Sequence, residues 1–305
     1  MKLAPSRKRR GFFKPKRVPW GEGMNRLYEY FKSGTGATRS GGAIGIEIET
    51  QFANENGHPI STRQTDVLLR MPVSGGCLKL ELGRQMIELN VPPEPSFERL
   101  WKKTSGCLEQ LYDTAGELGC YPVFAPTPYI GWPDPLLYVQ EERDAVWVEL
   151  DGASALENLS RCSSVQFTVD VNPVDAISWI NKLWGARFHE GDYAGNDGLW
   201  QSYIVQSRFG YHPDRYGGPE GFADLCDYVA RLAEHEVVMH HGAPCRRLIE
   251  NVCDPDINLF LRSIWWHYRL RRYGDALAIE IRPFPRNGDE NIPKQWELAA
   301  GVLGI

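Results

Sequence analysis

Two glutamates that share one face of a predicted strand are the first residues that could do chemistry. In residues 44–50, isoleucines alternate with Gly45, Glu47 and Glu49, which is the period of a β-strand. The two carboxylates would therefore lie about 7 Å apart on the same face. Because like charges repel and glutamate is a poor strand former, this pair requires a chemical explanation.

A second carboxylate pair lies in residues 78–91, which we predict to form two strand segments around Gly83. Glu81 and Glu88 are seven residues apart, so on one straight strand they would face opposite sides. A bulge or bend at Gly83 would return both carboxylates to one side of a sheet.

Two further predicted strands have an apolar face and a polar face. In residues 164–171 the polar positions are Gln166, Thr168 and Asp170. In the strand LAIEIRP the polar positions are Glu280 and Arg282, opposite apolar residues that we expect to face the core.

Together these faces hold five glutamates and few basic residues. A solvated sheet face normally mixes charges of both signs, and that interpretation stays open as the alternative. Crowded carboxylates suit a hard divalent cation, Mg²⁺ or Mn²⁺, and an adjacent arginine can bind phosphate oxygens. This combination is typical of phosphoryl transfer from a nucleotide. The sequence has no P-loop and no GxGxxG motif, so a nucleotide would bind through metals on the floor of the sheet.

Strand and helix patterns mix irregularly along the chain, which predicts an α+β fold on a mainly antiparallel sheet. Residues 120–138 and 187–220 are predicted to be irregular. Besides the strands above, we predict a strand at 145–150, and helices at 26–32, 97–118, 173–188, 222–235, 258–273 and 294–305.

Composition excludes some classes of protein. The chain has 305 residues and a formal net charge of -5, so it is not a nucleic-acid binder by bulk charge. No apolar run reaches the roughly 18–20 residues of a membrane helix. Seven cysteines without a CxxC pair predict reduced thiols in a cytoplasmic protein.

The N-terminus differs from the rest of the chain. Eight lysines and arginines and no acidic residue fall within the first 17 positions. We predict a basic arm at residues 1–22 and one domain at 23–305. The arm is either a solvated, partly disordered segment or a contact for an acidic partner or nucleic acid.

In this order, the motifs resemble the plant and proteobacterial glutamate–cysteine ligase family, of the glutamine synthetase-like carboxylate–amine ligases. The segments that carry the resemblance are LYEYFKSG, AIGIEIETQF, LKLELGRQMIELNVPPEP, NLSRCSSVQFTVDVN, SRFGYHPDRYGGPEGFADLCDYVARL and AIEIRPFPR. It runs from about residue 24 to the C-terminus. Thr168 and Arg84 depart from the usual asparagine and glycine of the family.

The resemblance implies a curved sheet with helices on its outer face and ATP-dependent amide formation through an acyl phosphate. By position, Glu47, Glu81 and Glu88 would hold one magnesium, and Glu49, Gln166 and Glu280 a second beside ATP. Arg282 would act on the transferring phosphate, with Arg215 as a further ATP contact. The substrate contacts would be Arg208, Arg84, Gln85 and Arg161, and the catalytic residues Arg282 and Glu47.

The substrates stay open. The chain is shorter than typical family members and its substrate loop diverges, which favours an acid other than glutamate, either a peptide or a specialised metabolite. Two other functions are carried as alternatives: a non-catalytic relative that binds a partner through the basic arm, and a metal-dependent phosphotransferase or hydrolase.

Overall fold

The structure is a computed structural model that describes residues 21–35, 42–140, 142–206, 215–237, 246–247, 257, 261 and 264–305. Its helices are α1 (Glu22–Lys32), α2 (Thr62–Arg70), α3 (Phe97–Glu117), α4 (Glu142–Asp151), α5 (Ala153–Leu156), α6 (Ala176–Ala186), α7 (Ala194–Gln206), α8 (Leu225–Leu232) and α10 (Ile292–Leu303). Its strands are β1 (Ile44–Asn54), β2 (Cys77–Leu80), β3 (Met86–Glu94), β4 (Cys120–Val123), β5 (Ser164–Asp170), β6 (Tyr216–Gly217), β7 (Glu236–Val237), β8 (Arg246–Arg247), β9 (Trp265–Trp266), β10 (Tyr268–Tyr273) and β11 (Ala276–Pro285).

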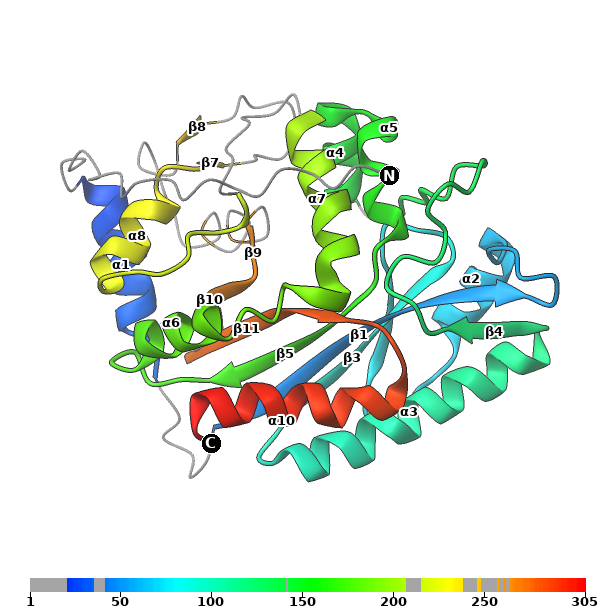
Figure 1. Cartoon of the computed structure of the whole chain (residues 1–305), viewed down its shortest axis with the longest axis horizontal. Coiled ribbons are helices and arrows are strands. Elements are labelled where there is room, and N and C mark those ends of the chain that lie inside the picture. Colours follow the sequence, from blue (N-terminus) through cyan, green and yellow to red (C-terminus); the bar gives the residue numbers. More distant parts are fainter. Residues whose placement is uncertain are drawn as a thin grey trace.

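Seven of these strands form one sheet in the order β10-β11-β5-β1-β3-β2, with β4 paired to β1 (Figure 1). Every pairing within this sheet is antiparallel. The prediction of an α+β fold on a mainly antiparallel sheet is confirmed. The strands come from both ends of the described chain, so the sheet joins segments that are distant in sequence.

One face of the sheet is apolar and packs on helices. Ile46 and Ile48 of β1 and Phe167 of β5 are almost fully buried in the main core. Helices α3 and α10 cover this face (Figure 1). The Phe167 ring lies 6.3 Å from that of Phe97 on α3 and 5.5 Å from that of Trp296 on α10. Burying such side chains stabilises the fold by roughly 1.5–3 kcal/mol each.

Most of the predicted elements are present. Helix α3 begins after Ser96, whose hydroxyl accepts a hydrogen bond from the amide of Arg99, as the predicted N-cap requires. The two predicted segments around Gly83 are β2 and β3. Gly83 has no room for a side chain, since a Cβ there would lie 2.3 Å from the carbonyl oxygen of Ser160.

Four element predictions were wrong. Residues 145–150 belong to helix α4, and residues 265–273 form strands β9 and β10 instead of a helix. The segment predicted to be irregular after residue 187 contains helix α7, and the one after residue 120 begins with strand β4. In β10 the apolar Tyr268 and Leu270 alternate with arginines, and pairing with β11 outweighs the local helical pattern.

The predicted basic arm lies outside the described residues except for Gly21 and Glu22, the second of which begins α1. Among the described residues, no helix combines the length and apolarity needed to cross a membrane.

Candidate active site

The sheet face opposite α3 and α10 carries the predicted polar residues. Glu47 and Glu49 point away from the isoleucines of β1 because successive side chains alternate. The strand register places Glu49 opposite Glu88 of β3, and Glu47 opposite Gln166 of β5. Pairing between strands thus gathers residues that lie up to 119 positions apart in the sequence.

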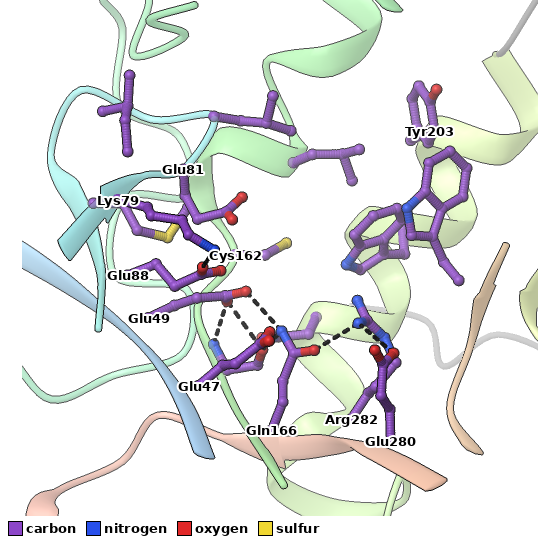
Figure 2. A pocket seen from close by; sticks show the side chains of 18 of the residues that line it. Glu47, Glu49, Lys79, Glu81, Glu88, Cys162, Gln166, Tyr203, Glu280 and Arg282 are labelled. Carbon is purple, nitrogen blue, oxygen red and sulfur yellow. Dashed lines mark hydrogen bonds and ion pairs between the residues drawn. The ribbon is translucent and has the colours of Figure 1, made fainter. Parts of the chain in front are cut away.

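The polar face of the sheet forms the floor of a cavity of about 430 Å³ (Figure 2). Its wall is aromatic and aliphatic, contributed by Trp147 of α4, Trp200 and Tyr203 of α7, and Trp265 of β9, with Leu156 and Leu159. The polar floor and the apolar wall together form a site that can orient a polar ligand and limit its contact with water.

Three carboxylates in the described part of the chain lie close enough together to share a metal ion. One oxygen each from Glu49, Glu81 and Glu88 lies within 4.8 Å of the others. Figure 2 shows these side chains on one side of the cavity. The resemblance grouped Glu81 and Glu88 with Glu47, whereas the geometry places Glu49 with them. The turn around Gly83 brings Glu81 and Glu88 to the same side.

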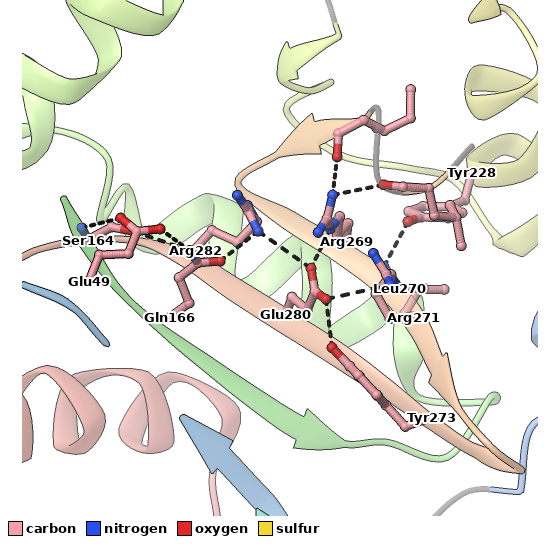
Figure 3. Close-up of polar contacts among 12 residues, drawn as sticks. Glu49, Ser164, Gln166, Tyr228, Arg269, Leu270, Arg271, Tyr273, Glu280 and Arg282 are labelled. Carbon is pink, nitrogen blue, oxygen red and sulfur yellow. Dashed lines mark hydrogen bonds and ion pairs between the residues drawn. The ribbon is translucent and has the colours of Figure 1, made fainter. Parts of the chain in front are cut away.

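A chain of hydrogen bonds runs across the floor from Glu49 to Arg282 (Figure 3). The Glu49 carboxylate accepts bonds from the Ser164 amide at 2.7 Å and from the Gln166 side-chain amide at 2.9 Å. The Gln166 carbonyl in turn accepts a bond from Arg282 at 2.6 Å. Gln166 therefore couples the acidic cluster to the arginine.

Burial and neighbouring negative charges raise the pKa values of two carboxyl groups on the floor. Burial, followed by the charges of Glu88 and Glu280, raises the pKa of Glu47 to about 8. Burial, followed by the charge of Glu88, raises the pKa of Glu49 to about 7. Both groups would ionise more readily beside a cation, so these shifts fit a floor built to hold one.

Glu280 lies in the opposite electrostatic environment. Its carboxylate receives hydrogen bonds from the Arg269 Nε and from the Tyr273 hydroxyl, the latter at 2.8 Å. Arg271 and Arg282 lie 3.8 Å and 3.7 Å from its oxygens. Burial alone would raise the pKa of Glu280, but the three guanidinium groups outweigh it and lower the pKa to about 2. The floor thus has an acidic half and a basic half.

Gln85 and Arg161, two of the predicted substrate contacts, do not line the cavity. Gln85 is fully buried and donates to the Gln51 side chain and the Ser160 carbonyl. Arg161 donates to the carbonyl oxygens of Tyr129 and Trp132 and to Glu157. These contacts show that Gln85 and Arg161 help to hold the fold together, and their roles in substrate binding stay predictions.

Three other predicted arginines are not placed at the floor. Arg84 and the buried Arg215 are absent from the lining of the cavity. Arg208 lies outside the described residues. All the other predicted metal and catalytic residues line the cavity.

Several lining residues were missed by the sequence analysis. They include Lys79, Ser164, Tyr193, Arg269 and Arg271. Arg269 and Arg271 carried a signal, since they alternate with apolar residues in a segment that was predicted to be a helix. Period-two spacing there would have placed both arginines on the face of Glu280 and Arg282.

No protein-family model and no curated protein matches the sequence. Among solved structures, it is similar to a bifunctional glutathione synthetase from Pasteurella multocida, with 14% identity over 92% of this chain and 40% of that one, at a TM-score of 0.45. It is also similar to glutamate–cysteine ligase from Francisella tularensis in complex with AMP, with 10% identity over 87% and 67% of the chains, at a TM-score of 0.44.

A third similar structure is a glutamine synthase homolog, with 10% identity over 94% of this chain and 60% of that one, at a TM-score of 0.39. The chain spans about two fifths of the length of the glutathione synthetase. At these identities and TM-scores, the likeness does not by itself establish a shared activity.

Proposed function

We propose that the protein is an ATP-dependent carboxylate–amine ligase that uses a divalent cation, Mg²⁺ or Mn²⁺. The observation that carries the proposal is one cavity whose floor is divided into a carboxylate cluster and an arginine cluster joined through Gln166. Such a floor can bind a cation–nucleotide complex at one half and neutralise a transferring phosphoryl group at the other.

The proposed reaction joins a small-molecule or peptide carboxylate to an amine. The carboxylate oxygen attacks the γ-phosphorus of ATP, which releases ADP and leaves an acyl phosphate. The amine then attacks the acyl carbon, phosphate departs, and the amine gives up its proton. The intermediate step is needed because a free carboxylate is a poor electrophile.

Glu49, Glu81 and Glu88 are the residues that would hold a cation. They supply only oxygen ligands, which Mg²⁺ and Mn²⁺ prefer, and the separation of these oxygens suits one shared ion. Glu47 lies beside them and is a further candidate ligand. When bound, the cation would offset the negative charge of the ATP phosphates.

Arg282 is proposed to stabilise the charge on the transferring phosphoryl group. Its guanidinium is held by Gln166 at 2.6 Å and by Glu280 at 3.7 Å, so its position is set before a ligand arrives. Glu280 is assigned here to orienting arginines, because the surrounding guanidinium groups oppose the second metal site that was predicted for it.

The aromatic wall is proposed to keep water from the acyl phosphate until the amine attacks. The resemblance names glutamate and cysteine as candidate substrates, and a different acid is the other candidate. Incubating the protein with ATP, Mg²⁺ and pools of acids and amines tests the proposal. ADP release that needs both an acid and an amine supports it, whereas ADP release without an amide product would indicate a phosphotransferase or hydrolase.

The Glu49→Gln variant isolates the role of the acidic cluster. It should lose about 10²–10³-fold of the cation-dependent ADP release, since such losses follow removal of one group that stabilises charge in the transition state. It should stay folded, because the apolar face of β1 that packs in the core is unchanged. Glu55→Gln, at an exposed position beyond the cavity, is the matched control. An active Glu49→Gln variant would overturn the cation assignment.

A further inference from the structure

Lys79 places one positive charge at the acidic side of the cavity. It lies on β2, the strand at one edge of the main sheet, directly opposite Glu88 of β3 in the strand register. Among the described residues that line the cavity, Lys79 is the one basic residue outside β10 and β11. Figure 2 shows its ammonium group directed toward Glu88. This lysine therefore belongs to the acidic half of the floor and not to the arginine cluster.

The ion pair between Lys79 and Glu88 is loose. The Lys79 Nζ lies 3.8 Å from Glu88 Oε1, which is beyond hydrogen-bond distance, and the lysine side chain is 51% exposed. Exposed pairs of this kind contribute little to stability. The Glu88 carboxylate also accepts a hydrogen bond from the Asn90 side-chain amide, so it keeps a partner when the lysine leaves. Lys79 can thus move on its flexible stem at a small cost.

The charge of Lys79 acts on the carboxylates that are proposed to hold a cation. Glu88 belongs to the group of three whose oxygens lie within 4.8 Å of one another. Burial is the main cause that raises the pKa of Glu47, and the charge of Lys79 acts in the opposite direction. Because like charges repel, an ammonium group beside Glu88 disfavours a divalent cation on the same carboxylate. The lysine and the cation therefore compete for this part of the floor.

A displaced ammonium group needs another anion nearby. Arg282, the proposed contact of the transferring phosphoryl group, lies on β11, three strands beyond β3 in the sheet order. A nucleotide whose terminal phosphate faces Arg282 would extend its other phosphates back over the acidic cluster, toward β2 and Lys79. The lysine ammonium is a compact point charge that suits phosphate oxygens.

We infer that Lys79 is an exchangeable counter-ion, which pairs with Glu88 in the free protein and moves to the nucleotide phosphates when the cation and the nucleotide bind. This inference rests on the proposed function. It makes the binding of the two ligands cooperative, because the cation releases the lysine and the nucleotide takes it up. Lys79 would thereby favour the complex of cation and nucleotide over the cation alone.

Two titrations of the full chain test this inference. Mn²⁺ alone is followed by the electron paramagnetic resonance of the free ion, and preformed Mg²⁺–AMP-PNP is followed by calorimetry. In Lys79→Met, Mn²⁺ should bind about threefold or more tightly, because the competing charge is gone. Mg²⁺–AMP-PNP should bind about threefold or more weakly, since a lost charge-assisted phosphate contact, worth about tenfold or more, exceeds that gain. Lys79→Arg keeps the charge and should change each affinity less.

Lys103→Met is the matched control, because Lys103 also pairs with a glutamate, Glu94 at 3.0 Å, but does not line the cavity. It should leave both affinities unchanged. Equal changes in Lys103→Met and Lys79→Met would reflect net charge alone and would overturn the inference. Mn²⁺ binding that is not tighter in Lys79→Met, or Mg²⁺–AMP-PNP binding that is not weaker, would overturn it as well. A wild-type protein that does not bind Mg²⁺–AMP-PNP would instead count against the proposed function itself.

Discussion

Single carboxylates on this sheet differ in charge state according to their neighbours. Glu47 and Glu280 share a face, yet burial and nearby acids raise the pKa of Glu47, whereas three arginines outweigh burial and lower the pKa of Glu280. Residue type and spacing predicted that both would lie on this face. They did not predict which would meet arginines, since Arg269 and Arg271 reach Glu280 only through the pairing of β10 with β11.

The raised pKa values of Glu47 and Glu49 make a prediction about pH. The folded, metal-free protein keeps protons on these groups that the unfolded chain releases, so its free energy of unfolding should fall as pH rises from about 4.5 through about 8. Mg²⁺ removes this penalty, so its stabilising effect should be larger at pH 8 than at pH 6.

Melting temperatures measured in EDTA and in Mg²⁺ at pH 6, 7 and 8 check this. The Glu47→Gln variant lacks one of the two titrating groups and should show a weaker dependence on pH. An increment from Mg²⁺ that is independent of pH, or larger at pH 6, would contradict the assignment of these carboxylates to the cation.

At the scale of elements, the turn between β2 and β3 decides whether the acidic cluster can form. The spacing of Glu81 and Glu88 predicts a bend at Gly83, and the hairpin of β2 and β3 is present. Strands in which apolar and polar residues clearly alternate, such as β1 and β5, were also predictable from residue spacing. Strand β10 and helix α7 were not, because β10 is fixed by its pairing with β11 and α7 packs against β6, and the local residue patterns do not show these contacts.

Gly83→Ala should destabilise the protein by about 1–3 kcal/mol, the usual cost of forcing atoms into a packed region. The added methyl group would clash with the Ser160 carbonyl and the Gln85 side chain. Because the turn would shift, Mg²⁺ binding should weaken as well. Urea unfolding and Mg²⁺ titration measure the two effects.

Gly106→Ala is the control for that substitution. Gly106 lies within helix α3 and a Cβ there meets no atom within 4 Å. The change should stabilise the protein by about 0.4–1 kcal/mol by restricting the unfolded chain. Equal destabilisation by both substitutions would show that the effect at Gly83 is not due to the local clash.

At the scale of the whole molecule, the site is assembled from most of the described chain. The floor uses residues of β1, β2, β3, β5, β10 and β11, and the wall uses residues of α4, α7 and β9. Figure 1 shows α4, α5 and α7 on the side of the sheet opposite α3 and α10. The sequence motifs predicted the residues of the floor but not those of the wall, because tryptophans are equally expected in a core.

Ligand binding should therefore stabilise the whole fold. At a concentration about 100-fold above Kd, Mg²⁺–AMP-PNP should raise the free energy of unfolding by about 2.7 kcal/mol and the melting temperature by several degrees. EDTA should abolish most of the increase. A nucleotide effect that does not need the divalent cation would argue against binding at the acidic cluster.

The wall has a practical consequence for finding the substrates. Trp147, Trp200 and Trp265 all line the cavity, and the rings of Trp147 and Trp200 lie 5.2 Å and 5.1 Å from that of Trp265. Three coupled indoles at one site are an intrinsic optical reporter of occupancy. Changes in tryptophan emission can thus screen unlabelled acids and amines for binding before any turnover assay is known.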